Sequence, residues 1–129
     1  CEDPAYVLGR LFSVYEAIQT AANPGLNATI KDKYFNSAAS TPATIFPILG
    51  NLAQKHLKKL KGSSMGLCVF YEKQLGEISS LLSSAFPTRM SLPQQGSFQL
   101  GYYHQTQKKF RDIEEAKNNK STNKDNTEV

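Results

Sequence analysis

Residues 26–42 read LNATIKDKYFNSAASTP, and this stretch carries the clearest start signal in the chain. Thr29 is a hydroxyl residue that can cap a helix, and Asp32 falls three residues later, beside the positive end of the helix dipole. The stretch therefore predicts a short helix over residues 30–39, exposed on one side.

The same stretch places positive charge next to flat apolar surface. Lys31 and Lys33 stand directly before the ring pair Tyr34 and Phe35. Nucleic-acid strands favour this combination, because phosphates take the charge and bases stack on rings. The pattern also fits a plain helix start with solvated lysines and buried rings. Both interpretations stay open from the sequence.

A long helix is predicted before this stretch. Asp3 can cap it, Pro4 suits its first position, and residues 23–25, Asn-Pro-Gly, end it after Ala22. Its apolar residues cover roughly 160° of the helical wheel, which is more than one neighbour would bury, so we expect it to lie centrally. They are Val7, Leu8, Leu11, Phe12, Val14, Tyr15, Ile18 and Ala22.

Two further helices are predicted after the stretch. Thr41 and Pro42 repeat the cap-plus-proline start, Pro47 should bend the third helix without ending it, and Gly62 closes it. Ser63 or Ser64 caps the fourth, which ends before Pro87. The expected inward faces are Ile45, Ile48, Leu49, Leu52, His56 and Leu60 on the third, and Leu67, Tyr71, Leu75, Ile78, Leu82 and Ala85 on the fourth.

A fifth helix begins at a capping box formed by Ser91 and Gln94, and Gly96 and Gly101 should weaken it locally. Its expected inward face is Phe98, Tyr102, Phe110 and Ile113. Residues 117–129 are almost wholly polar and would gain no burial on ordering. We therefore predict an all-α single helical bundle of about five helices over residues 4–116, and a disordered C-terminal tail over 117–129.

Composition narrows the function classes. At 129 residues the chain has room for one core, no apolar run is long enough to span a membrane, and the net charge is +4. Two cysteines give no disulfide framework or metal-ligand spacing, so we expect a reducing cytoplasm and a buried, inert Cys68. Because the chain begins with Cys1, it could be part of a longer polypeptide.

Besides Lys31 and Lys33, two basic regions could contact phosphates. On the third helix Lys55, Lys58 and Lys61 form a ridge opposite the apolar stripe. On the fifth helix Lys108 and Arg111 share a polar stripe with His104 and Glu115. From Lys33 to Tyr71 the chain carries five lysines and no acid, which suits a polyanion or an acidic partner protein. Solvated surface charge explains the ridge equally well.

A fourth surface suggests protein contact. Gly76, Ser80, Ser83 and Ser84 give the fourth helix an outer face of small, uncharged side chains that would let another backbone approach closely, although an idle serine-rich surface fits as well. Nucleotide-binding loops, zinc-protease motifs, paired cysteines and clustered acids are all missing from the sequence. We therefore expect no catalytic residue, no metal and no cofactor.

Several motifs in order give a family resemblance: the run at 26–42, FPILGNLAQKHLKKL at 46–60, LGEI at 75–78 and GYYHQ at 101–105. The chain resembles the C-terminal helical domain of the large subunit of subtype I-C CRISPR Cascade complexes, which is also made separately as their small subunit. The likeness extends over residues 4–110.

The resemblance implies a non-catalytic helical subunit, present in more than one copy, that supports the R-loop beside backbone and large subunits and meets the crRNA indirectly. It assigns DNA contact to Arg10 of LGRL, to Lys31 and Lys33, and to the lysines after Gln54. The family often carries Arg where Lys31 and Lys33 stand, so charge is kept while bidentate geometry is lost.

Rival functions remain at this point. The chain could be an excised domain of the large subunit, or a purely structural scaffold whose lysines only confer solubility. A small nuclease using His104 with Lys108 is a third hypothesis, weakened because His104 has no paired Asp and no second histidine nearby.

Overall fold

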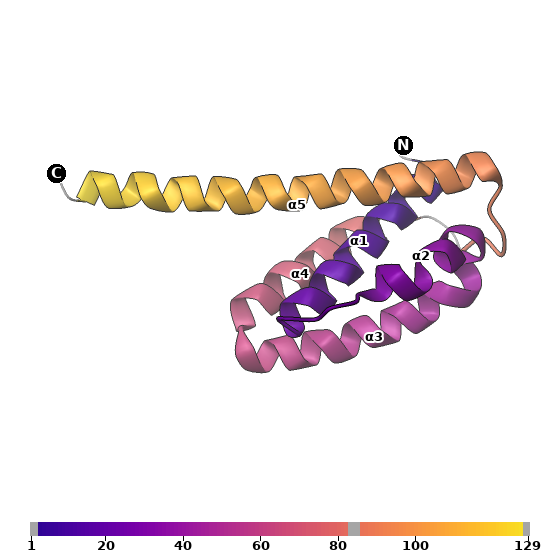
Figure 1. Ribbon diagram of the computed structural model, residues 1–129, viewed down its shortest axis with the longest axis horizontal. Helices are drawn as coiled ribbons and strands as arrows, with labels where there is room; N and C mark the ends of the chain where they lie inside the picture. The colour runs from indigo at the N-terminus through magenta and orange to yellow at the C-terminus, as the bar shows by residue number, and fades with distance from the viewer. Residues whose placement is uncertain (1–2, 83–85, 128–129) are drawn as a thin grey trace.

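The computed structural model in Figure 1 describes residues 3–82 and 86–127, and it describes their side chains except those of residues 113 and 116–127. These residues form five α-helices and no strand, which confirms the predicted all-α bundle. The helices are α1 (Pro4–Ala22), α2 (Ile30–Ser40), α3 (Pro42–Ser63), α4 (Met65–Ser79) and α5 (Leu92–Thr127).

Hydrogen bonds at the helix starts match the predicted caps. The Asp3 carboxylate accepts from the Ala5 backbone N–H at 3.0 Å. Thr29 forms the reciprocal box with Asp32, whose carboxylate accepts from the Thr29 backbone N–H at 2.8 Å. The Ser91 box on α5 is equally complete. Local capping chemistry therefore fixed these three boundaries.

Thr41 departs from its predicted role. It occupies the N-cap position of α3, but its side chain makes no capping bond there. Its hydroxyl instead donates to the Ser37 carbonyl oxygen at 3.0 Å, which satisfies an acceptor at the end of α2. The expectation for Pro47 is confirmed as far as continuity goes, because α3 runs through it without a break.

Helix α1 is the centre of the bundle, as its wide apolar face predicted. It contacts each of the other four helices. Figure 1 shows α1 and α4 lying between α5 along one edge of the bundle and α3 along the opposite edge. Leu8, Phe12 and Ile18 of α1 are completely buried.

The inward faces of α3 and α4 agree in part with the predicted ones and are slightly rotated from them: Leu49, Leu60, Tyr71 and Ile78 are buried as predicted. Ile48 was expected inside but is 42% exposed, whereas its neighbour Phe46 is buried. Leu67 was also expected inside but is 43% exposed, and Cys68 takes the core position. The rotation follows from where α1 lies, because a helix buries the side that faces its neighbour. Helix α4 also ends earlier than predicted, and Ala85 lies outside the described residues.

Four rings join α1, α2 and α5. Phe12 meets Phe35, Phe98 and Tyr102 edge to face, with ring centroids 5.4, 5.9 and 5.8 Å apart. Edge-to-face contacts of this kind add to the stabilisation from burial alone. Phe35 therefore belongs to the core, and Tyr34 is also partly buried against it.

Two glycines let α1 and α5 cross with their backbones in contact. A Cβ atom on Gly9 would overlap the Phe98 carbonyl oxygen and lie 2.8 Å from the Tyr102 backbone nitrogen. A Cβ on Gly101 would overlap the Tyr6 carbonyl oxygen. Gly101 thus has a packing role beyond the local weakening that the sequence suggested, because it lets the two backbones approach closely.

Helix α5 continues past the other helices (Figure 1). Phe110 lies on this part and is 61% exposed, so its predicted burial is wrong, because no neighbouring helix reaches that side. The side chain of Ile113 lies outside the described set. The backbone of α5 is helical through Thr127, and the division into a 4–116 domain and a disordered 117–129 tail stays a prediction.

Candidate nucleic-acid interface

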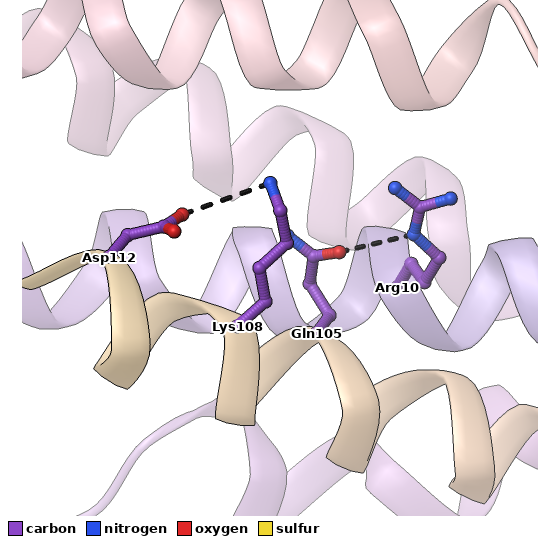
Figure 2. A network of polar contacts seen from close by, with 4 residues as sticks. All are labelled: Arg10, Gln105, Lys108 and Asp112. Carbon is purple, nitrogen blue, oxygen red and sulfur yellow. Dashed lines mark hydrogen bonds and ion pairs between the residues drawn. The ribbon is translucent and has the colours of Figure 1, made fainter. Parts of the chain in front are cut away.

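The α1–α5 crossing brings Arg10 beside the polar stripe of α5. Arg10 is half-buried, and its Nε donates to Oε1 of Gln105 at 3.1 Å. Gln105 is buried, so this bond fixes the direction of the Arg10 stem. In Figure 2, Arg10 from α1 and Gln105 and Lys108 from α5 project toward the same side of the two helices.

These side chains line a polar hollow of about 210 Å³. Sequence reasoning assigned Arg10 to DNA contact through one motif and Lys108 and Arg111 through another, and the structure places all three around one cavity. We call this cavity the basic hollow. Its lining is Tyr6, Arg10, His104, Gln105, Lys108 and Arg111.

Tyr6 is a member of the hollow that sequence reasoning missed. Its hydroxyl lies 2.7 Å from Nδ1 of His104, and the two rings meet edge to face at 5.6 Å. The bond ties His104 to α1 and orients the ring. No pattern in the sequence could show this pairing, because the residues are 98 positions apart.

One carboxylate opposes the cations. Asp112 lies one helical turn after Lys108, and its Oδ2 is 3.8 Å from the Lys108 ammonium (Figure 2). Both side chains are about half exposed, so water screens the pair and it contributes little to stability. Lys108 therefore stays exchangeable toward a stronger anion such as a phosphate.

Lys31 is held over the aromatic cluster. Its ammonium lies 4.9 Å from the ring centroid of Tyr102, 5.1 Å from that of Tyr103 and 5.5 Å from that of Phe35. Cation–π attraction of this kind favours a fixed position for the charge. Lys33 is more exposed and lies over Tyr34 at 5.2 Å. Their predicted DNA contacts stay predictions.

Burial of tyrosines beside this cluster predicts alkaline instability. Burial and a hydrogen bond to Glu16 raise the pKa of Tyr102 well above its usual value, and burial raises the pKa of Tyr15 and Tyr71. Below about pH 10 both folded and unfolded chains keep these protons; above it the unfolded chain releases them first, so the free energy of unfolding falls as pH rises.

Urea unfolding measured between about pH 8 and 11 should show this fall, and Tyr102→Phe should flatten it. Tyr103→Phe is the control, because Tyr103 is adjacent in sequence but half exposed. An equal slope in the two variants would contradict the role given to Tyr102.

The ridge on α3 is exposed as predicted. Lys55, Lys58 and Lys61 all face solvent. Because α3 lies at the opposite edge of the bundle from α5, the ridge and the basic hollow are separate surfaces (Figure 1). Lys59, at the edge of the apolar stripe, donates to Oδ1 of Asn23 at 2.6 Å.

His56 is a partly buried histidine rather than a free one. Its Nδ1 lies 3.3 Å from the Asn23 amide nitrogen, while the buried Nε2 has no protein partner within the described part of the chain. Burial, helped by the Lys59 charge, lowers the pKa of His56. His56, predicted on the inward face of the third helix, is therefore hydrogen-bonded on one of its two ring nitrogens.

The predicted partner face on α4 is open to solvent where it is described. Gly76 and Ser80 are exposed, and Val69 lies on the same side, about two to three turns before them, with 55% of its surface exposed. A Cβ on Gly76 would meet nothing within 4 Å. The remaining two members of the predicted face, Ser83 and Ser84, lie outside the described residues.

The motifs of the sequence and the helical geometry agree with one protein family. The sequence model of the family described as CRISPR-associated protein (Cas_Csd1) matches residues 1–110. The chain belongs to the Cas_Csd1 family. The family resemblance drawn from the four motifs is thereby confirmed. No curated protein matches the chain.

The Cas_Csd1 match includes most of the candidate interface. It covers α1 to α4 and the first half of α5, so Arg10 and Lys108 lie inside it and Arg111 follows its last residue. Membership shows a CRISPR-associated protein, and the assignment of individual DNA contacts is a proposal.

Among the side chains that the structure describes, no cluster of three or more His, Cys, Asp or Glu residues is placed to hold a metal ion. No helix within residues 3–82 and 86–127 combines the length and apolarity needed to cross a membrane. Cys68 is buried, and desolvation together with Glu72 raises the pKa of its thiol, which agrees with an inert core residue.

Proposed function

We propose that this chain is the non-catalytic small subunit of a cytoplasmic type I-C Cascade complex, in which it bridges backbone subunits and stabilises the R-loop by binding DNA phosphates. The observation that carries the proposal is the basic hollow, where Arg10, Lys108 and Arg111 converge from two helices. Family membership supports a CRISPR role, and the convergence supports an anionic ligand.

The mechanism is electrostatic. Guide RNA reads the target sequence by base pairing, and replacing a DNA duplex by the RNA–DNA heteroduplex is nearly balanced in free energy. A subunit that holds phosphates of an opened strand tips this exchange forward without reading bases. Helices α1 and α5 bring the charges close together, because Gly9 and Gly101 let the two backbones cross in contact.

The other basic residues extend this surface. We assign the ridge of Lys55, Lys58 and Lys61 a second, phosphate-tracking contact, and Lys33 a peripheral one. Lys31 also has a structural role, because its ammonium lies over three aromatic rings. A strand that meets both regions must pass around the bundle, since they lie at opposite edges.

Protein partners are assigned to α4. The exposed face formed by Val69, Gly76 and Ser80 suits close approach of a Cascade backbone subunit, the large subunit or a further copy of the chain. The crRNA would be met only indirectly, through those subunits. If the chain is the C-terminal domain of the large subunit, the same surfaces would contact the DNA and the neighbouring subunits.

Charge reversal tests the proposal. Lys108→Glu with Arg111→Glu should weaken single-stranded DNA binding about tenfold or more and reduce the log–log salt slope by about 1.4, because two phosphate contacts are lost. Binding is measured by fluorescence anisotropy over a salt series, and R-loop formation by a crRNA-containing complex assembled with each variant.

Lys73→Glu with Arg89→Glu is the matched control, since both side chains are exposed outside the hollow and the net charge changes equally. The control should keep both DNA binding and R-loop formation. If the hollow variant also kept them while assembly stayed normal, the chain would be a scaffold and the strand-holding function would be wrong. His104→Ala with unchanged target cleavage would exclude the nuclease hypothesis.

A further inference from the structure

An apolar groove lies between α4 and α5, and α1 forms its floor. Its volume is about 430 Å³. The lining includes Val14 and Ala17 of α1, Leu67 and Phe70 of α4, and Gln105 of α5. The groove arises because α4 and α5 both pack on α1 but do not contact each other anywhere in the described chain.

The groove has the properties of a binding surface. Leu67 and Phe70 border it, and Phe70 is 45% exposed although a ring of this size is normally buried. Exposed apolar side chains that cluster around a concavity mark interaction sites, unlike the same residues scattered singly. The volume falls in the range of about 300–1,000 Å³ that is typical of pockets for small molecules.

The groove adjoins the basic hollow. Gln105 lines both cavities, so its side chain is their shared wall. The consecutive residues Lys108 and Lys109 line the hollow and the groove respectively. Figure 2 shows Lys108 and Gln105 rising together from α5 on the side that faces α4. A concave apolar surface and a cluster of cations are therefore next to each other.

We propose that the groove receives one unstacked base of a single DNA strand whose adjoining phosphate lies in the basic hollow. This inference rests on the proposed function and names the form of its ligand. A nucleotide joins a flat ring with apolar faces to an anion, which matches the two neighbouring cavities. Phe70 offers the stacking surface, and the Gln74 amide at the groove offers a donor and an acceptor to a base edge.

A protein side chain is the competing occupant. An apolar residue of a partner could fill the groove, but it would make no use of the neighbouring cations of the hollow, Lys108 and Arg111. The nucleotide accounts for both cavities at once, and stacking on Phe70 is sequence-tolerant because every base has a π face. This tolerance fits a subunit that leaves sequence reading to the guide.

Asp112 provides an internal check, because it borders the groove and pairs with Lys108. Its carboxylate repels a phosphate in the hollow. Asp112→Asn should therefore tighten binding of single-stranded DNA a few-fold at low salt, with the gain shrinking as salt screens the charge.

The decisive experiment compares two ligands with the full chain: an oligothymidylate and an abasic phosphodiester chain of the same length. The wild-type protein should prefer the oligothymidylate about tenfold, the contribution of one stacked base. Phe70→Ala should remove this preference, and Phe70→Trp should keep it. Phe110→Ala, at an exposed ring beyond the groove, should leave it unchanged.

The outcomes separate the inference from the proposed function. If the wild type binds neither ligand, the proposed function fails. If it binds both ligands equally and salt-dependently, the function stands and base insertion is wrong. If Phe70→Ala keeps the preference but releases the chain from the crRNA-containing complex, the groove is a protein interface and the inference is overturned.

Discussion

Gly101→Ala is expected to lower the free energy of unfolding by about 3 kcal/mol, near the upper end of the usual effect of overpacking. A methyl group at this position would overlap the Tyr6 carbonyl oxygen and lie 2.9 Å from the carbonyl carbon. The obstacle is the backbone of α1, which cannot rotate away as a flexible side chain can. The two helices must separate, and the rings between them lose contact.

Gly96→Ala is the matched control on the same helix. Nothing lies within 4 Å of a Cβ at Gly96, so this change should stabilise the protein by up to about 1 kcal/mol through helix propensity. Urea unfolding followed by circular dichroism measures both values. Similar effects of the two substitutions would contradict the close crossing of α1 and α5.

Phe12→Ala should lower the free energy of unfolding by about 3–5 kcal/mol, the usual effect of removing a fully buried ring. Phe12 is completely buried and touches three other rings. These rings come from α2 and α5, so the cavity would lie where three helices meet and no single side chain could fill it. The cation–π contacts of Lys31 should weaken as well, because its ammonium lies over the rings of Phe35 and Tyr102, which pack on Phe12.

Phe110→Ala is the control for ring removal, since Phe110 is largely exposed and should change stability by less than about 0.5 kcal/mol. Thermal unfolding with chemical denaturation gives both values. If Phe12→Ala were as mild as Phe110→Ala, the ring cluster would not be the core of this bundle.

The helix boundaries could be predicted because their causes are local. Asp3, Thr29 and Ser91 each bond to a backbone group within three residues, so the cap can be recognised from a few letters. Thr41 shows the limit of this logic, because a hydroxyl between two helices can serve the end of one rather than the start of the next.

The faces of α3 and α4 were predicted less well, since a helical wheel gives the apolar arc without the direction of the neighbour. Ile48 and Leu67 lie at the margins of those arcs and ended outside, whereas Phe46 and Cys68 turned inward. Leu67 lines the apolar groove between α4 and α5, so the residue whose burial was wrongly predicted belongs to a candidate binding surface.

The candidate site was predicted residue by residue but without its arrangement. Arg10, Lys108 and Arg111 were each proposed for DNA contact, yet their convergence depends on a crossing of helices distant in sequence. Gly9 in LGRL and Gly101 in GYYHQ were a possible signal for that crossing, because a glycine inside a helix commonly marks close backbone approach. Tyr6 and Gln105 carried no signal of their own.

The central place of α1 also governs how the chain can acquire its structure during synthesis. Its contacts with α5 join residues as far as 98 positions apart, so the ribosome releases the first helix long before its main partner exists. Until then Phe12 lacks its contacts with the rings of α5, and the earlier helices can assemble only loosely. Folding of this bundle is therefore completed at the last helix, after translation has passed it, and a nascent chain stalled before that point stays vulnerable to proteolysis.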